Sequence, residues 1–476
     1  MPELPDKRTA FIDWYLAVVD AAELTDKRYG VKGMNVWTPY GFLVRRNLDA
    51  ILIREIERTG SRPVEFPALI PQNEFDKEKE HIKGFDAQVY WVTRGGANTL
   101  DVPLVLRPTS ETAMYPVFAL WIRSHSDLPL NVYQIVNIFR YETKMTRPFL
   151  RIREIHFFEE HTCQPDDDGA TARVASNLAA FGKMAGALTL PYLAIRRPDW
   201  DKFPGARYSI ALDVPVGEGR TLQVASIHHY GENFSRPFEI TYEDSGGKRR
   251  YVSQTTFGLS ERLIGTVLAV HGDAKGAVFP STLAPFQVVV VPIESKGTPR
   301  DALAGYAHKM VERLSEHGLR AHLDDRPDRP GAKYYYWECR GVPLRIELGA
   351  REMASGGGTA VNRLGAKVTL SAEKLEAQVT SALQAFDSQL AEAGQRLLDG
   401  AVTPADKLDE LSASTTVRRL SWCGREECGH AIEQAIGGAL LGTPEPALAV
   451  STGAPGPCIV CGRKEGAQWA YAGRPI

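Results

Sequence analysis

Basic residues gather in one short stretch of the sequence, FRYETKMTRPFLRIRE, which runs from position 139 to position 154. Its five basic residues are Arg140, Lys144, Arg147, Arg151 and Arg153. Planar guanidinium groups bind phosphate oxygens through paired hydrogen bonds, so a hairpin with arginines on one surface would hold a polyphosphate. A solvated hairpin whose arginines pair with glutamates at the surface fits the same residues, because such charge-rich hairpins are common.

Side-chain alternation in this stretch predicts two strands joined by a turn. Arg140 and Glu142 are two residues apart, so in a strand both side chains emerge on the same face, with a cation beside a carboxylate. The segment TKMTRP breaks the alternation and predicts the turn. Arg151 and Arg153 then share one face of the returning strand.

A second polar group lies upstream, in RPTSETAMYP. Thr109 and Glu111 offer a hydroxyl and a carboxylate two positions apart, which suits a small cationic amine. Thr-Ser-Glu is also a common N-cap and first turn of a helix, so both interpretations remain open.

Two further stretches place polar side chains in or beside apolar elements. The run LQVASIHHYGENFS contains Gln223, Ser226 and His228, although a single histidine in a strand is often a satisfied core residue. The run FGLSERLIGTVLAV places Ser260 and Arg262 at the start of an apolar helix, whose N-terminus would strengthen anion binding. The sequence has neither a P-loop nor the glycine-rich dinucleotide fingerprint, so a bound nucleotide would need arginines on an antiparallel sheet.

Four of the six cysteines form a cluster near the C-terminal end. They are Cys423, Cys428, Cys458 and Cys461. Four residues separate the first two and two residues separate the last two, a spacing typical of a closed, structural zinc site that would fold the tail. Free thiols or disulfides are the alternative, and His430 could replace one ligand. Cys163 and Cys339 lie apart from the cluster and are predicted to be packing residues.

The charge and hydropathy of the whole chain exclude several classes of protein. Lys and Arg number 56 against 58 Asp and Glu, and this formal net charge of −2 argues against a protein that coats DNA or anionic membrane. Any anion site must therefore be local. No apolar run approaches the roughly 18 residues of a membrane span, and the start of the chain lacks an export signal. We therefore expect a cytoplasmic protein.

The elements that must position these residues follow two different patterns. Apolar residues between positions 11 and 18 repeat at helical spacing and predict an amphipathic helix packed on the first domain. From about residue 35 to residue 285, helical patterns mix with short aromatic and β-branched strands, which predicts an α+β domain with an antiparallel sheet.

After residue 285 the pattern becomes that of a separate α/β domain. The run FQVVVVPI predicts a buried strand, followed by a helix that stops at Gly318 and a strand at LRAHLDD. AKYYYWECRG then predicts a short helix, PLRIELG a strand, and SGGGT a turn before a long helix that begins near Ser371. From about residue 395 we expect a helical and loop-rich tail that carries the clustered cysteines.

Together these motifs resemble the class II prolyl-tRNA synthetases of the archaeal and eukaryotic-like type, over essentially the whole chain. EFPALIP around Pro67 looks like the first motif of the class, which lies at the dimer interface. FRYETKMTRPFLRIRE looks like the second motif and GLSER like the third. LRPTSET and RPGAKYYYWECRGVPLRIELG are similar to segments of the prolyl branch. The resemblance implies a homodimer with a catalytic domain at 1–285, an anticodon-binding domain at 286–394 and a zinc-binding domain at 395–476.

The resemblance also implies a role for each candidate residue. The imino group of proline would be held by Thr109, Glu111 and His228. Arg140 would contact the proline carboxylate and the α-phosphate of ATP. The other contacts to ATP, which carries Mg²⁺, would come from Glu142, Arg151, Gln223, Ser226, Ser260 and, on the γ-phosphate side, Arg262. Anticodon bases would be read by Glu338, Arg345 and Arg351.

The implied reaction is the ATP-dependent ligation of L-proline to tRNA(Pro) through prolyl-adenylate. Attack of a carboxylate on the α-phosphorus needs no protein acid, base or nucleophile, so catalysis rests on positioning and on cations near the developing charge. Arg140 and Arg262 are the candidate catalytic residues. Two alternatives are a paralogue that activates a proline-like acid for biosynthesis and a non-catalytic, synthetase-like RNA-binding regulator.

Three features bear on how closely the chain follows this family. About ninety residues separate His161 from Thr255, too few for the editing domain that many bacterial members insert, so we expect no editing in cis. Relatives usually end in a tyrosine whose carboxylate folds back to the catalytic domain, whereas this chain ends WAYAGRPI, so Tyr471 takes another role or the tail docks differently. The tripeptide at 349–351, GAR, replaces a more usual Gly-Pro before a basic residue, which is expected to loosen the backbone locally.

Overall fold

The computed structural model describes residues 4–78, 88–143, 145–295, 299–412, 414–448 and 453–476. Lys144 of the basic stretch lies outside the described residues. Among the helices of the described ranges, none combines the length and the hydropathy needed to cross a bilayer.

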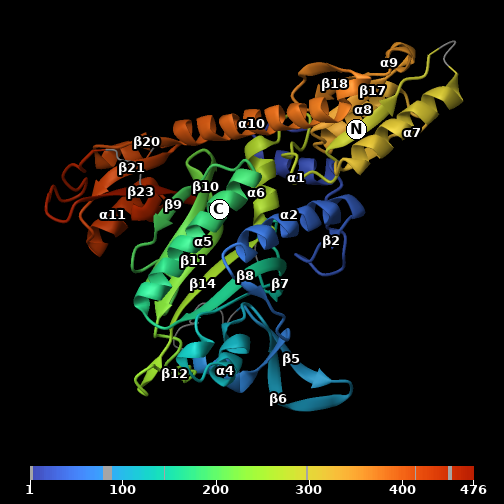
Figure 1. Cartoon of the computed structure of the whole chain (residues 1–476). Helices are drawn as coiled ribbons and strands as arrows, with labels where there is room; N and C mark the ends of the chain where they lie inside the picture. Colours follow the sequence, from blue (N-terminus) through green and yellow to red (C-terminus); the bar gives the residue numbers. More distant parts are fainter. Residues whose placement is uncertain (1–3, 79–87, 144, 296–298, 413, 449–452) are drawn as a thin grey trace.

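An eleven-stranded sheet runs through the body of the molecule (Figure 1). Its central strands are β7 (Leu130–Phe139), β8 (Glu154–Gln164), β9 (Leu193–Arg196), β10 (Tyr208–Gly217), β11 (Arg220–Gly231) and β14 (Ser253–Ser260). They pair antiparallel in the order β9-β10-β11-β14-β8-β7, and β3 (Arg62–Pro63) adds a parallel edge. The predicted antiparallel sheet is confirmed.

Helices bury the apolar side chains of this sheet. They are α1 (Phe11–Ala21), α2 (Pro39–Glu57), α5 (Asp167–Ala187) and α6 (Arg262–His271). Their apolar residues and those of the strands form one buried cluster, which includes Trp14, Tyr15 and Val18 of the predicted N-terminal helix. Polar caps begin two of the helices: Thr38 accepts a hydrogen bond from the N–H of Gly41 before α2, and Asp166 accepts one from Gly169 before α5.

A smaller antiparallel sheet lies below the main one in Figure 1. It consists of β4 (Leu69–Pro71), β5 (Tyr90–Gly95) and β6 (Asn98–Leu106), next to α3 (Gln72–Phe75) and α4 (Glu111–Trp121). Two further strand pairs are β1 (Thr25–Asp26) with β2 (Val36–Trp37) and β12 (Thr241–Glu243) with β13 (Arg249–Tyr251). The structure describes every residue from His161 to Thr255. This segment forms the end of β8, α5, strands β9 to β13 and the start of β14. It therefore contains no inserted domain, as its length predicts.

The α/β domain has a five-stranded sheet of order β16-β15-β17-β18-β19. Its strands are β15 (Val288–Pro292), β16 (Ala321–Leu323), β17 (Leu344–Leu348), β18 (Gly358–Asn362) and β19 (Lys367–Leu370), and its helices are α7 (Arg300–Glu316), α8 (Pro330–Cys339) and α9 (Ala350–Ser355). The predicted alternation is confirmed from β15 to β17. The glycine-rich segment is more than a turn, because it leads into the β18–β19 hairpin, whose outer strand is largely exposed and carries no core pattern.

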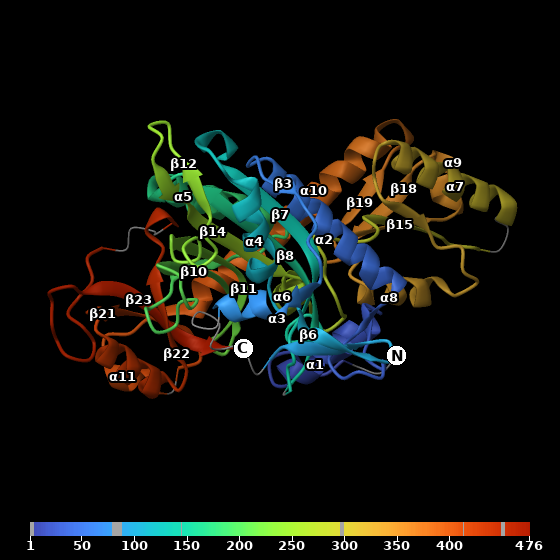
Figure 2. The ribbon, with the colours of Figure 1, turned by 90° about the horizontal axis from the view of Figure 1, so that it is seen from below.

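The long helix α10 (Leu375–Ala401) continues past residue 394 and connects the α/β domain with the tail (Figure 1). Seen from below, the tail and the α/β domain lie on opposite sides of the central body (Figure 2).

The expectation of a helical and loop-rich tail is wrong. The tail contains α11 (Glu426–Ile436) and the strands β20 (Val402–Pro404), β21 (Val417–Trp422), β22 (Ala439–Pro444) and β23 (Gln468–Pro475). These strands extend the main sheet, because β22 pairs with β9 and β23 pairs with β11. Tyr471 of β23 packs in the apolar cluster around Ile195 and Leu441, so its role is structural.

Candidate active site

The basic stretch is a connecting loop, and the predicted strands that would carry its arginines are wrong. β7 ends at Phe139 and β8 begins at Glu154, so the four arginines of the stretch, all of them described, lie outside both strands. Met145 and Phe149 have positive φ angles of 51° and 63°, which lie outside the β region, so the loop cannot continue as an extended strand at these residues.

Contacts within the loop separate the roles of its arginines. Arg151 Nε lies 3.2 Å from Glu142 Oε2. Arg153 Nε donates to the carbonyl oxygen of Glu142 at 2.7 Å, and its guanidinium lies 4.7 Å from the centre of the Tyr141 ring. Arg153 therefore holds the loop together, whereas the Arg151–Glu142 pair lines a cavity.

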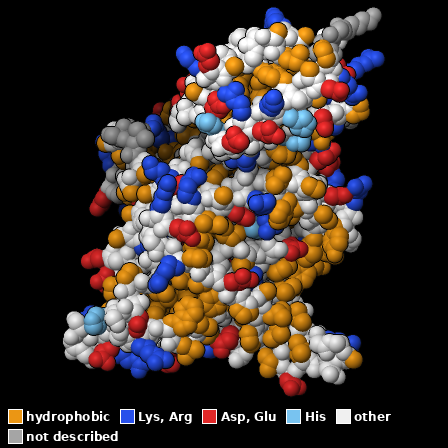
Figure 3. Space-filling view, turned by 45° about the vertical axis from the view of Figure 1, so that its right-hand side comes forward, with side chains coloured by type: hydrophobic (Ala, Val, Ile, Leu, Met, Phe, Trp, Pro, Cys, Tyr) orange, Lys and Arg blue, Asp and Glu red, His pale blue; other side chains and the backbone are white. Residues whose placement is uncertain are grey.

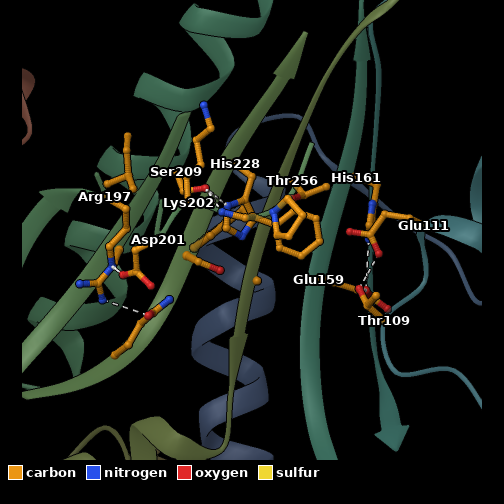
Figure 4. Close-up of a pocket in the computed structure, with 18 of the residues that line it drawn as sticks. Thr109, Glu111, Glu159, His161, Arg197, Asp201, Lys202, Ser209, His228 and Thr256 are labelled. Carbon is orange, nitrogen blue, oxygen red and sulfur yellow. Dashed lines mark hydrogen bonds and ion pairs between the residues drawn. The ribbon is translucent and has the colours of Figure 1, made fainter. Parts of the chain in front are cut away.

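A cavity of about 420 Å³ opens over the main sheet (Figure 4). The predicted residues that line it are Thr109, Glu111, Arg140, Gln223, Ser226 and His228. Strand register builds part of its wall, because four residues on adjacent strands stand directly opposite one another: His161 on β8, Thr256 on β14, His228 on β11 and Ser209 on β10. The antiparallel sheet thus brings together residues from distant parts of the sequence.

A second cavity, of about 160 Å³, adjoins the first. The predicted residues that line it are Arg140, Glu142, Arg151, Gln223, Ser226, Ser260 and Arg262. Arg140, Gln223 and Ser226 line both cavities. The structure therefore brings together all the residues predicted for a proline and ATP site, with Arg140 at the junction.

Glu111 provides a buried carboxylate in the larger cavity, and only 3% of its surface is exposed. The hydroxyl of Thr109 donates to its Oε2 at 2.5 Å, and the hydroxyl of Tyr230 donates to its Oε1 at 3.0 Å. The alternative interpretation of Thr-Ser-Glu as a helix start is also confirmed, because Ser110 occupies the N-cap position of α4 and Glu111 lies in its first turn. The carboxylate of Glu111 thus accepts a hydroxyl at each oxygen, and it also interacts with the charges of His161 and Arg140.

Sequence analysis missed a second carboxylate, that of Glu159, and its partner His161. Glu159 accepts hydrogen bonds from the Ser110 hydroxyl and from Gln134 Nε2, the latter at 2.8 Å, and its Oε2 lies 3.1 Å from His161 Nε2. Although burial opposes both charged forms, this contact lowers the pKa of Glu159 and raises the pKa of His161. The alternation of Phe157, Glu159 and His161 along one face of β8 was the signal that could have identified them.

His228 stays neutral beside this pair. Burial and the nearby charge of His161 lower the pKa of His228 to about 3. Its Nδ1 lies 2.7 Å from the hydroxyl oxygen of Ser209, which also accepts the N–H of Phe203 at 2.9 Å. The carboxylates of Glu111 and Glu159 lie together in this part of the cavity, where they would attract the ammonium group of an amino acid.

The smaller cavity is lined by three arginines, Arg140, Arg151 and Arg262, and by one carboxylate, that of Glu142. Arg262 begins α6, and its guanidinium donates to the carbonyl oxygens of Leu150 and Gln223 at 2.9 and 2.8 Å, so it ties the basic loop to β11. Burial lowers the pKa of Arg262, and burial together with the charge of Arg262 lowers that of Arg140. Two guanidinium groups in a partly buried cavity create a positive potential that favours phosphate.

The four clustered cysteines of the tail meet in space. Their sulfur atoms lie within 4.8 Å of one another, and the Sγ atoms of Cys423 and Cys461 are 3.7 Å apart. Tetrahedral zinc with bonds of about 2.3 Å needs sulfur separations of about 3.8 Å, so the residues fit this metal. All six cysteines are described, and all are free thiols, which excludes the disulfide alternative in this structure. His430 pairs with Glu426 and Glu433 instead of joining the cluster.

Cys163 and Cys339, the two cysteines predicted to be packing residues, are both buried outside this cluster.

Two of the three predicted anticodon residues meet in the α/β domain. Arg345 Nη1 lies 2.9 Å from Glu338 Oε1, and the Arg345 guanidinium stacks 4.3 Å from the Tyr334 ring centre. Arg351 instead pairs with Glu352, and 88% of its side chain is exposed. The GAR tripeptide at 349–351 does not loosen the backbone, because it begins α9.

Comparisons with known proteins agree with both domains. The family model "tRNA synthetase class II core domain (G, H, P, S and T)" matches residues 90–271, and the model "Anticodon binding domain" matches residues 287–382. The chain is 46% identical over 460 residues to proline–tRNA ligase of Thermococcus kodakarensis, covering 95% of each chain. It is 46% identical over 464 residues to proline–tRNA ligase of Methanoculleus marisnigri, covering 96% of each.

Solved structures are similar along the whole chain. Giardia lamblia prolyl-tRNA synthetase in complex with prolyl-adenylate superposes with a TM-score of 0.94 at 32% identity and covers 100% of both chains. Prolyl-tRNA synthetase from Cryptosporidium parvum, complexed with halofuginone and AMPPNP, has a TM-score of 0.92 at 30% identity and covers 99% of both.

Proposed function

Because the chain belongs to the class II prolyl-tRNA synthetases, we propose that it activates L-proline with ATP and transfers the prolyl group from prolyl-adenylate to tRNA(Pro). The observation that carries this proposal is the junction of two cavities at Arg140, one with the buried carboxylates of Glu111 and Glu159 and the other lined by guanidinium groups. A proline zwitterion and a triphosphate are complementary to these two environments.

Proline is held at its two charged ends in this proposal. Its ammonium lies at Glu111, with Thr109 and the neutral His228 completing the polar wall. Its carboxylate turns toward Arg140 at the junction of the cavities.

ATP binds in the smaller cavity with its α-phosphate at Arg140. Its remaining protein contacts are assigned to Glu142, Arg151, Gln223, Ser226, Ser260 and Arg262. Mg²⁺ bound with ATP would supply further positive charge against the triphosphate. The two arginines then stabilise the charge that develops on phosphate during attack by the proline carboxylate, and no protein nucleophile is required.

We assign the same three parts of the chain to this function as the sequence predicted. They are a catalytic domain at 1–285, an anticodon-binding domain at 286–394 and a zinc-binding tail at 395–476, with α10 crossing the second boundary. The thiolates of the tail hold a structural Zn²⁺ with a closed coordination sphere, and the enzyme acts in the cytoplasm.

A homodimer is proposed because large apolar side chains are exposed on the small sheet and on α4. They are Leu69, Trp91, Val102, Leu120 and Trp121, which are 40 to 66% exposed. Hydrophobic surface also extends over the lower part of the view in Figure 3, the end of the molecule where β5, β6 and α4 lie in Figure 1. A second copy would cover it. Sedimentation equilibrium should give twice the mass of the chain, and a monomer mass at micromolar concentration would contradict this proposal.

Arg345 allows the anticodon role to be tested separately. Replacing Arg345 with alanine should lower kcat/KM for tRNA(Pro) in aminoacylation by roughly 10- to 100-fold, since one base contact contributes about 1–3 kcal/mol. Proline-dependent pyrophosphate exchange, which needs no tRNA, should remain within twofold of wild type. Lys309→Ala, an exposed change on α7, is the matched control. Equal losses in both assays would assign Arg345 to folding.

The proposed function is tested by proline-dependent exchange of pyrophosphate into ATP, followed by charging of purified tRNA(Pro). We expect both reactions. Absence of exchange with proline would defeat the proposal, exchange without charging would favour a biosynthetic paralogue, and RNA binding without either would favour a regulator. The purified chain is not expected to hydrolyse misacylated tRNA, because no domain is inserted between His161 and Thr255.

A further inference from the structure

The loop between β9 and β10, residues 197–207, forms one wall of the larger cavity (Figure 4). Its residues that line the cavity are Arg197, Trp200, Asp201, Lys202, Phe203 and Pro204. The Phe203 ring lies 4.8 Å from the His228 ring, and the Phe203 N–H donates to the Ser209 hydroxyl that contacts His228. The position of this loop therefore sets the shape of the cavity around His228.

Trp200 connects the same loop to the cysteine-bearing tail. Its indole N–H donates to Glu433 Oε1 on α11 at 3.2 Å, and its ring stands edge-on to Trp422, with ring centres 5.8 Å apart. A Cβ added at Gly429 of α11 would lie 2.4 Å from the Trp200 ring. The indole is therefore packed directly against the α11 backbone, with no space for a methyl group between them.

Both tail surfaces that touch Trp200 are adjacent in sequence to cysteines of the cluster. Trp422 directly precedes Cys423, and Gly429 directly follows Cys428. Closing the four-sulfur cluster thus fixes both surfaces relative to each other.

Arg197 provides a second connection from the loop to the tail. It donates to the carbonyl oxygen of Leu441 on β22 at 3.0 Å and to Gln223 Oε1 in the cavity wall at 3.1 Å. The tail therefore binds the loop at both ends of the segment from Arg197 to Trp200.

We propose that Trp200 is a positioning residue through which the four-cysteine tail holds loop 197–207 against the proline pocket. This inference rests on the proposed function. A loop that is already ordered loses little conformational entropy when proline binds, whereas a loosened loop must be ordered by the ligand. Proline binding should depend on the Trp200 contact, while ATP, which lies in the other cavity, should be little affected.

Gly429→Ala tests the contact with a single methyl group in the zinc-loaded enzyme. We expect KM for proline to rise about tenfold in pyrophosphate exchange, with KM for ATP within twofold and zinc content unchanged. Gly305→Ala, at a helical glycine of α7 with no neighbouring atom within 4 Å of the added Cβ, is the matched control and should leave both constants unchanged.

Two substitutions of Trp200 add readouts that a general loss of stability would not reproduce. Trp200→Ala should raise KM for proline more than Trp200→Phe, which keeps a ring against α11. Limited trypsin digestion should cut Trp200→Ala faster after Lys202 or Arg207, while the zinc content stays the same. The cleavage assay does not depend on enzyme activity, so it tests the position of the loop by itself. Absence of exchange in the wild-type enzyme would defeat the proposed function but would leave this test of the loop valid.

Unchanged KM for proline and unchanged cleavage in both Gly429→Ala and Trp200→Ala would overturn the inference. Equal increases in KM for proline and ATP would also overturn it, because they would indicate a general disturbance of the sheet.

Discussion

Replacing Arg140 with alanine is expected to lower kcat/KM for proline-dependent pyrophosphate exchange by about 10³-fold, since loss of a charged donor from a preorganised site commonly costs that much. Arg140 lines both cavities and is the one predicted residue assigned to both the carboxylate and the α-phosphate. The substitution removes contacts to both reacting groups, so KM for proline and kcat should both change. Steady-state exchange at varied proline and ATP concentrations measures this loss.

Two further variants identify the cause of that loss. Arg140→Lys keeps the charge but lacks the planar fork, so its activity should fall between those of wild type and Arg140→Ala. Arg396→Ala removes an arginine that is 70% exposed on α10 and should leave exchange unchanged. A loss smaller than tenfold in Arg140→Ala would contradict the role assigned to this residue.

Replacing Cys458 with serine should remove bound zinc and unfold the tail. Cys458 is buried in the core of the tail together with Cys423 and Cys428, so a metal held by these thiolates would stabilise the apolar cluster around them. Structural zinc contributes an apparent binding free energy on the order of 10 kcal/mol to folding, which is more than the tail can replace by apolar packing. Because the variant loses one of the four thiolate ligands, metal analysis should find less than about one tenth of a zinc ion per chain.

Limited proteolysis distinguishes loss of metal from loss of structure. Unfolding of the tail should expose the segment after α10 to cleavage, and it should free the edge of β9 and the first residues of β11 from their tail strands. Cys339→Ala, at a buried cysteine outside the cluster, should keep both the zinc and the resistance to protease. A zinc-free Cys458→Ser protein with a protease-resistant tail would show that thiol packing alone folds this region.

The residues selected from sequence motifs lie together around two adjoining cavities, because chemistry restricts residue types. Thr109 and Glu111 were candidates for an amine site and Arg140 for a phosphate site, each with a structural alternative, and the family resemblance joined them in one site. Glu159 and His161 were missed although they alternate on β8, because a buried ion pair in a strand looks like ordinary strand alternation until its neighbours are known.

The errors occurred where structure depends on long-range pairing or unusual backbone angles. The arginine loop was assigned to strands because positive φ at Met145 and Phe149 leaves no pattern in the sequence. The strands of the tail were missed because β22 and β23 pair with β9 and β11, which lie more than two hundred residues earlier in the chain. Gly442 and Pro444 also interrupt the apolar pattern of β22.

In the proposed function, the two cavities joined at Arg140 form one site for prolyl-adenylate. Calorimetric titration of the protein with a non-hydrolysable prolyl-adenylate analogue measures whether they do. The analogue occupies both cavities as a single molecule, so its binding avoids the entropy lost when two separate ligands bind. It should therefore bind at least about 10³-fold more tightly than proline or ATP alone. An analogue that binds no more tightly than ATP alone would contradict the account.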